Sequence, residues 1–441
     1  MTVDRADAVQ APPPEADEPS RTNTKMAWTI TGALVIFMVL NWADKAVLGI
    51  AAQPIKEELG LTSAQFGLIG SAVFFLFSIS GLVVGFVANS VKTKWVLFTI
   101  AALWSATVIP VLVSASALTL LISRIGLGAA EGPAAPVANA AVFEWFPKEK
   151  RSLPSACIAS GASIAKIAIA PVLTLIVVSW GWRAAFISLA LVGLLWCLAW
   201  AFIGRPGPYA APRGKKERSE CEEQVRVPFR RIALSPSFIG GAIGTFSVYA
   251  MISVVLTWLP SYFEASLGFS RVQAGSMFGL PSIAALITMV GAGWLTDRKL
   301  SRGGNSRVWR GLFPGGALIV GGGMLALLPY SSGAWTSVAI LVAAYGFMLI
   351  VMPVMNAVVS QITPAAQQPG ALGTFLAVQS LAGLFAPALS GVLLDRAATS
   401  ASGYNQIFQL IGLTVVVGGI IIVLMVDPDR DARRVLRGQA A

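Results

Sequence analysis

The chain has 441 residues; 56% of them are hydrophobic, 12% are charged, and the formal net charge is +11. A soluble domain carries about 25% charged residues, so this composition excludes an ordinary soluble protein. Apolar blocks of about 20 residues recur along the chain without the alternation typical of β-barrel strands. They predict an all-α polytopic membrane protein.

The composition also argues against catalysis and metal binding. The chain has no histidine, the commonest general base and metal ligand. Cys157, Cys197 and Cys221 show neither metal-ligand spacing nor an evident disulfide pattern, and no phosphate loop or nucleophile–base pair is visible. We therefore predict no enzymatic activity, no metal and no cofactor. The basic excess is expected in cytoplasmic loops rather than on a nucleic-acid surface.

Taken in order, the chain divides into two similar halves. Residues 1–25 are rich in proline and poor in bulky apolar residues, which predicts a disordered cytoplasmic tail rather than a signal peptide. Six spans are then expected in residues 26–203 and six in residues 236–427, separated by a cytoplasmic linker at 204–235 and followed by a cytoplasmic tail at 428–441. The twelve spans are placed near residues 28–50, 66–88, 95–113, 117–144, 152–178, 183–203, 237–260, 272–296, 308–330, 335–361, 369–394 and 404–426.

The distribution of basic residues predicts the orientation. With the N-terminus inside, 25 of the 32 lysines and arginines fall in cytoplasmic segments, 4 in outer loops and 3 within spans. Positive charge is retained on the cytoplasmic side of membrane proteins. Both termini are therefore expected in the cytoplasm, with the chain crossing the plasma membrane.

The stretch LISRIGLGAAEGPAAP, residues 121–136, places two charges in an apolar span. Seven residues bring a helix back to within about 20° of its starting direction, so Arg124 and Glu131 share one face about 10 Å apart. Such charges are costly unless they face protein or a water-filled cavity. A purely structural pair at a helix end is the alternative. We favour a transport pathway.

Three more ionisable residues, Asp44, Lys45 and Lys166, lie within spans. Ideal helices place Asp44, Lys45 and Arg124 towards the outside, and Glu131 and Lys166 near the midplane. The five carry a surplus of one positive charge when Glu131 is ionised, which favours an anionic substrate. The alternative for the two lysines is that Lys45 extends to the outer interface and Lys166 faces a cytoplasmic vestibule.

A second set of features concerns gating and the pocket wall. GFVANSVKTK (85–94) and GWLTDRKLSR (293–302) follow the second span of each half. Asp297 and Arg298 are expected to latch the two bundles in one state, whereas Asn89 and Ser90 replace them in the first half and make a weaker latch. Tyr249 is a candidate pocket hydroxyl, although an aromatic residue in such a helix more often packs.

Several motifs resemble the anion:cation symporter family of the major facilitator superfamily. They are NWADKAVLGIA (41–51), SRIGLGAAEGPAAP (123–136) with NAAVFEWFPKEKR (139–151), GWRAAF (181–186) and TWLPSYF (257–263). The resemblance implies the major facilitator fold, with twelve helices in two six-helix bundles, and proton-driven uptake of organic anions. It also implies that Asp44 and Glu131 carry the coupling proton, that Arg124 responds to them, and that the cation after the aspartate, Lys45, binds substrate.

This sequence departs from the family pattern at three places. Lys45 replaces an arginine, Phe77 stands where sugar-acid members have a tyrosine, and Lys166 adds a cation. These changes favour an aromatic or less hydroxylated carboxylate over a polyhydroxylated acid. The second half offers Asn356, Ser360, Gln379 and Ser380 as polar contacts on the basis of depth alone.

The predicted function is thus a monomeric secondary transporter for a small organic anion and protons in the lipid bilayer, such as an aromatic or sugar-derived carboxylate. A drug/proton antiporter or a metabolite exporter of the same superfamily is the main alternative. A transport-like sensor is less favoured because the tails and the linker are too short for an output module.

Overall fold

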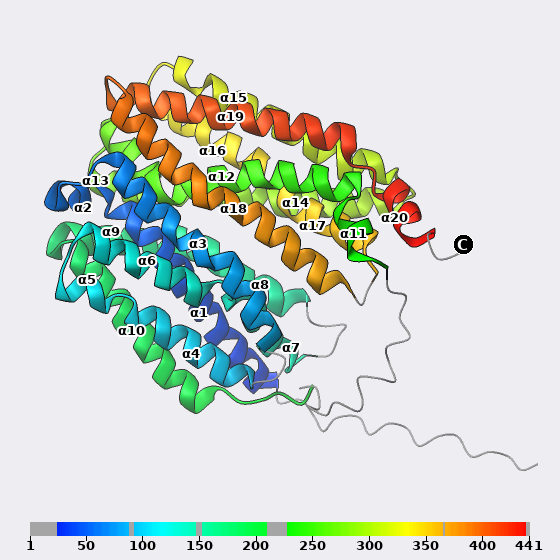
Figure 1. Ribbon diagram of the computed structural model, residues 1–441, viewed down its shortest axis with the longest axis horizontal. Helices are drawn as coiled ribbons and strands as arrows, with labels where there is room; N and C mark the ends of the chain where they lie inside the picture. The colour runs from blue at the N-terminus through cyan, green and yellow to red at the C-terminus, as the bar shows by residue number, and fades with distance from the viewer. Residues whose placement is uncertain (1–23, 88–91, 147–151, 210–226, 365–366, 438–441) are drawn as a thin grey trace, which may run out of the picture.

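The computed structural model describes residues 24–87, 92–146, 152–209, 227–364 and 367–437, and within these ranges it is helical without strands (Figure 1). The prediction for the N-terminal tail, most of the linker prediction, and Asn89 and Ser90 lie outside the described residues.

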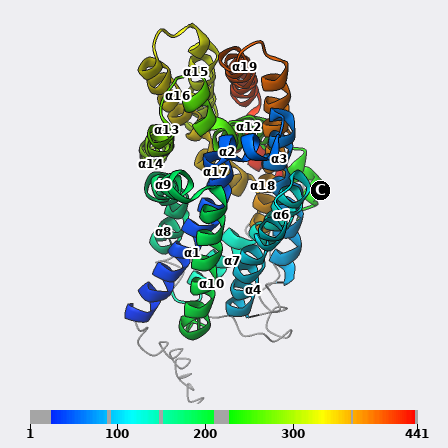
Figure 2. The same cartoon turned by 90° about the vertical axis from the view of Figure 1, so that its left-hand side faces the viewer.

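The helices of the first half lie together on one side of the molecule (Figures 1 and 2). Their bounds are α1 Thr24–Ile50, α2 Ala52–Leu59, α3 Ser63–Val87, α4 Thr93–Ala106, α5 Ile109–Val113, α6 Ala117–Glu131, α7 Ala134–Phe143, α8 Ser152–Ile164, α9 Ala170–Trp180 and α10 Trp182–Ile203. A π-helical turn, Ala165–Ile169, joins α8 to α9. Such turns are rare and often occur at functional sites.

The second half lies against the first and is assembled in the same manner. Its helices are α11 Phe229–Ala233, α12 Pro236–Ala265, α13 Arg271–Met277, α14 Leu280–Ser301, α15 Phe313–Leu327, α16 Ala334–Leu349, α17 Val351–Ile362, α18 Gln368–Arg396, α19 Ser400–Met425 and α20 Pro428–Arg437. Short π and 3-10 turns, Val308–Leu312 and Leu328–Tyr330, flank α15.

Among the described residues, eleven helical segments are long and apolar enough to cross a membrane. The fourth predicted span, 117–144, is not one of them because it is divided into α6 and α7 at Gly132 and Pro133. Proline lacks the amide hydrogen that the helix interior requires, so a break there is expected. The count of twelve spans therefore remains a prediction.

The two halves meet closely at the end of the molecule that carries α2, on the left of Figure 1. There α1 packs on α12, α3 on α18, and α9 on α13. At Gly49 of α1, even a Cβ atom would overlap the backbone carbonyl of Leu256 in α12. The Ser71 hydroxyl of α3 accepts a hydrogen bond from the Ala388 amide of α18 at 3.1 Å. We refer to this as the closed end.

The segment after residue 427, predicted to be a tail, is helical in the structure as far as Arg437. Its buried carboxylate, Asp431, accepts hydrogen bonds from the Ser237 amide at 2.8 Å and from Arg430 Nε at 2.9 Å. Burial alone would raise the pKa of Asp431, but these donors hold it below its usual value. The anchoring is thus present above the ordinary aspartate pKa and is lost as pH falls through the lowered one. A polar sequence was read as unstructured because its single buried acid could not be recognised.

Candidate functional site

The centre of the site is an ion pair between Lys45 of α1 and Glu131 at the end of α6. Lys45 Nζ lies 2.7 Å from Glu131 Oε2, and both side chains are almost fully buried. A hydrogen bond from Nζ goes to Asn41 Oδ1 at 2.8 Å, one turn back along α1. Glu131 Oε1 has no hydrogen-bond partner among the described residues. The pair therefore has an unused acceptor at a position shielded from bulk water.

This pairing differs from the two layers expected from ideal helices, in which Lys45 belonged with Asp44 and Arg124. A helical turn rises only about 5.4 Å, and the lysine side chain is long enough to cover that step. Lys45 therefore connects the two layers. The alternative in which it extends to the outer interface does not occur in this structure, because its amine is held inside by Glu131 and Asn41.

Arg124 and Asp44 form a second buried group beside the first. The guanidinium donates to the backbone carbonyl of Asp44 at 3.1 Å and lies 5.0 Å from the centre of the Phe186 ring. Arg124 is 1% exposed and Asp44 is 4% exposed. Arg124 Nε and Asp44 Oδ2 have no hydrogen-bond partners within the described ranges. A charged donor and a charged acceptor are thus close together without being fully satisfied by each other.

Lys166 contributes the remaining buried charge, from the π-helical turn. Its ammonium lies 5.4 Å from the centre of the Trp42 ring, and Lys45 Nζ lies 5.2 Å from the same centre. Cation–π contact offsets part of the cost of removing an ammonium from water. Lys166 is 6% exposed, and the structure gives it no carboxylate partner among the described residues. Of the three site cations, it is the one without a nearby protein anion.

An aromatic wall connects these charges to the second half. The Phe77 ring centre lies 5.4 Å from Lys45 Nζ, and Phe77 packs against Phe74. Phe74 in turn meets Tyr249 of α12 edge to face, with ring centres 5.8 Å apart. The packing role that we considered for Tyr249 is therefore seen directly, and the wall beside the cations is apolar.

A small cavity of about 60 Å³ lies between the halves next to this wall. Residues of α3, α18 and the α6–α7 break line it: Phe77, Gly81, Gly132, Pro136, Gly373, Leu376, Ala377 and Ser380. Gln379, also in α18, is buried, and its carbonyl oxygen has no partner among the described residues. Of the predicted second-half contacts, the cavity thus includes Ser380, and Gln379 is the neighbouring residue in α18.

The other predicted residues are less central. Asn356 of α17 is exposed and Ser360 is half-buried, and no contact joins either to the five charges. Asp297 and Arg298 are exposed at the end of α14, where the Arg298 guanidinium stacks over Trp294 at 5.0 Å. In this conformation Asp297 has no ion pair or hydrogen bond with the part of the chain that the structure describes.

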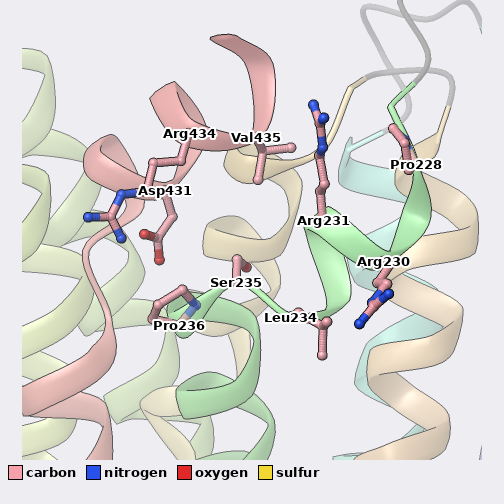
Figure 3. A pocket seen from close by; sticks show the side chains of 9 residues that line it. All are labelled: Pro228, Arg230, Arg231, Leu234, Ser235, Pro236, Asp431, Arg434 and Val435. Atoms are coloured by element: carbon pink, nitrogen blue, oxygen red, sulfur yellow. The ribbon is translucent and has the colours of Figure 1, made fainter. Parts of the chain in front are cut away.

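A larger cavity, of about 470 Å³, lies far from these charges, between α11 and α20. It is lined by Arg230, Arg231 and Arg434, but their guanidinium groups point in different directions, and Arg434 lies beside Asp431 (Figure 3). Because its cations do not converge, this cavity does not form an anion site like the buried one.

Sequence reasoning missed two members of the site, Asn41 and Trp42. Asn41 precedes Lys45 by four residues, which places both on one face of α1. That spacing was a usable signal. Nothing in the sequence indicated that two ammonium groups would lie against the Trp42 ring, since the second comes from another helix.

Known proteins place this fold and site in one class. The sequence pattern of the Major Facilitator Superfamily matches residues 34–350 and 306–440. The chain belongs to this superfamily, whose members are transporters rather than enzymes.

Individual relatives agree with the predicted resemblance to the anion:cation symporter family. A "probable sulfoacetate transporter" of Cupriavidus necator is 28% identical over 410 residues, covering 89% of this chain and 92% of the relative. A hexuronate transporter of Bacillus subtilis is 27% identical over 403 residues, with 88% and 92% covered. Among solved structures, a bacterial homolog of the human lysosomal transporter Spinster has a TM-score of 0.75 at 17% identity, with 93% and 97% covered.

Proposed function

We propose that this chain is a proton-coupled symporter that takes up a small organic anion by alternating access. The observation that carries the proposal is Lys166, a buried ammonium without a nearby protein anion, beside a second ammonium that is already paired. An unpaired buried charge costs several kcal/mol, and an anion between the two lysines would offset that cost. The names of the relatives, which are transporters of sulfoacetate and hexuronate, support an organic anion.

The coupling follows from competition for Lys45. The Lys45 ammonium is held by Glu131 at 2.7 Å and cannot bind a substrate carboxylate equally well at the same time. A proton on Glu131 would neutralise that carboxylate and release Lys45 to the substrate. Proton and anion would then each strengthen binding of the other, as linkage requires. Asp44 is proposed as a second proton carrier, with Arg124 as the charge that responds to it.

The wall of the site suggests the kind of anion. Trp42, Phe77 and Phe74 present rings next to the cations and no side-chain hydroxyl. An aromatic or sparsely hydroxylated carboxylate would bury its apolar part against these rings and leave no hydroxyl unpaired. Gln379 and Ser380 are proposed to contact the substrate from the second half.

We further propose a monomer of two six-helix bundles in the cytoplasmic membrane, with both termini inside. This orientation rests on the excess of lysine and arginine in the segments that would face the cytoplasm. The closed end would then face outwards, and Asp297 and Arg298 would control the inner end.

A thermal-shift screen of the purified protein tests the proposal. Sulfoacetate, glucuronate, benzoate and phthalate would be compared at two pH values, with the lipophilic cation tetraphenylphosphonium as the control. A ligand that binds the folded state raises the melting temperature by mass action. We expect at least one anion to stabilise the protein, more strongly at the lower pH. Stabilisation by the cation alone would favour the drug/proton antiporter and refute the proposal.

A further inference from the structure

The closed end contains a contact between the halves that involves a carboxylate and a helix terminus. Asp395, at the end of α18, accepts hydrogen bonds from two consecutive backbone amides of the first half. The Ser63 amide donates to Oδ1 and the Ala64 amide to Oδ2, both at 2.7 Å. One charged side chain of the second half thus binds the first turn of α3 with both oxygens.

The sequence around α3 explains why these two amides are available. The first turn of any helix has amides without partners in the helix. Thr62 and Gln65 form a reciprocal cap, in which the Thr62 hydroxyl accepts from the Gln65 amide at 3.2 Å and the Gln65 side chain accepts from the Thr62 amide at 3.0 Å. This local cap leaves the amides of Ser63 and Ala64 for an acceptor from elsewhere. The positive end of the helix dipole favours a carboxylate there.

Asp395 belongs to a sequence pattern that occurs at both ends of the second half. GVLLDR (Gly391–Arg396) repeats the G-x-L-x-D-R spacing of GWLTDR (Gly293–Arg298). Glycine and aspartate four residues apart share a helix face. At Gly391 a Cβ atom would overlap the Ser63 carbonyl, so the glycine allows the approach that brings Asp395 to the amides.

The second copy of the pattern is not engaged in this conformation. Nothing lies within 4 Å of a Cβ built at Gly293, and Asp297 has no partner among the residues that the structure describes. One copy is therefore bound across the halves and the other is free. This is the arrangement expected of two contacts that form in opposite states.

We propose that Asp395 and the N-terminus of α3 form the latch that holds the closed end closed, and that the latch must release before this end can open. Asp395 is exposed at the surface, so water can replace the protein partners when the halves separate. The latch would therefore be reversible rather than permanent. This inference relies on the alternating access proposed above, but on neither the substrate nor the coupling ion.

Opening of the closed end can be measured without substrate. In a background with Cys157, Cys197 and Cys221 changed to serine, Ser71→Cys places a thiol between α3 and α18, where Ser71 is 0% exposed. The full-length protein in lipid nanodiscs would be labelled with a maleimide. Loss of a charge-assisted contact at a helix N-terminus should raise the labelling rate of Asp395→Asn about tenfold over the parent.

Matched variants separate the latch from general loosening. Glu58→Gln removes an acid at the same end whose partners, Trp182 and Arg183, belong to the same half, and we expect its rate to stay within about twofold of the parent. Ser63→Pro removes one amide donor at a helix position that tolerates proline, while Ser63→Ala removes only the hydroxyl. Faster labelling of Ser63→Pro than of Ser63→Ala supports the latch. A parental rate in Asp395→Asn or in Ser63→Pro overturns it.

Discussion

The two halves share an architecture but divide the chemistry unequally. All five ionisable residues buried within spans belong to the first half: Asp44, Lys45, Arg124, Glu131 and Lys166. In the described spans of the second half, buried polar groups such as Gln379 and Ser380 are neutral, and charged residues lie towards the helix ends. The fold is thus repeated while the electrostatic function is not.

This asymmetry teaches which half would hold the charge of the substrate. Ionic interactions in a medium of low dielectric are strong and depend steeply on distance. A bound anion would stay with the cations of the first half, while the second half moves against it as a neutral wall. Variants in the two halves should therefore differ in kind, and four of them test this difference from the largest effect to the smallest.

The largest effect is expected from Glu131→Gln. Without a carboxylate to protonate, Lys45 is released permanently and binding no longer depends on the proton. In proteoliposomes, uptake driven by a pH gradient should be abolished, while exchange of substrate between preloaded vesicles stays measurable. If the variant still concentrates substrate on a pH gradient, Glu131 is not the coupling residue.

Arg124→Ala should come next, because it removes a buried cation and leaves the Asp44 carboxylate beside an empty space. Removing one member of a buried charged group costs about 3–5 kcal/mol, so both the melting temperature and anion binding should fall. The double variant Asp44→Asn/Arg124→Ala should regain much of the stability but not the binding. Recovery of binding in the double variant would remove Arg124 from the substrate site.

Lys166→Met should change affinity and stability in opposite directions. Loss of one ammonium near the anion is expected to weaken binding about tenfold, while removal of a desolvated charge should raise the melting temperature of the empty protein. Thermal-shift measurements with and without anion give both quantities. A lower melting temperature of the empty protein would mean that the amine has an internal partner.

The smallest effect is expected in the second half, from Gln379→Ala. A neutral hydrogen bond contributes about 1 kcal/mol, so anion affinity should fall by no more than about fivefold, without a change in pH dependence. Uptake measured against pH decides this point. An effect larger than that of Lys166→Met would break the comparison between the halves.

Much of the fold could be predicted because long apolar blocks have one stable form in a bilayer. The predicted span at 28–50 agrees with α1, and the span at 404–426 with α19, to within a few residues. The fourth span could not be placed as one helix, because two prolines and Gly132 divide it. The C-terminal helix was missed because its anchor, Asp431, binds Ser237 from a distant part of the sequence.

The site was predicted in composition but not in pairing. Helix periodicity placed Arg124 and Glu131 on one face, and both are buried in the structure. The contact between Lys45 and Glu131 depends on the reach of a long side chain across two helices, which periodicity does not describe. Asp395 was missed although its pattern is visible in the sequence, because attention went to the copy that follows the eighth predicted span.

The π-helical turn at Lys166 offers a route to altering the site by length instead of by side chain. A turn of this kind holds one residue more than an α-helix needs to join the same two segments. Deleting Ile167 should therefore yield a continuous α-helix in which α8 and α9 keep their present faces. The shortened turn would point the ammonium away from Trp42, so a chain one residue shorter should fold as before while losing its unpaired cation from the cavity.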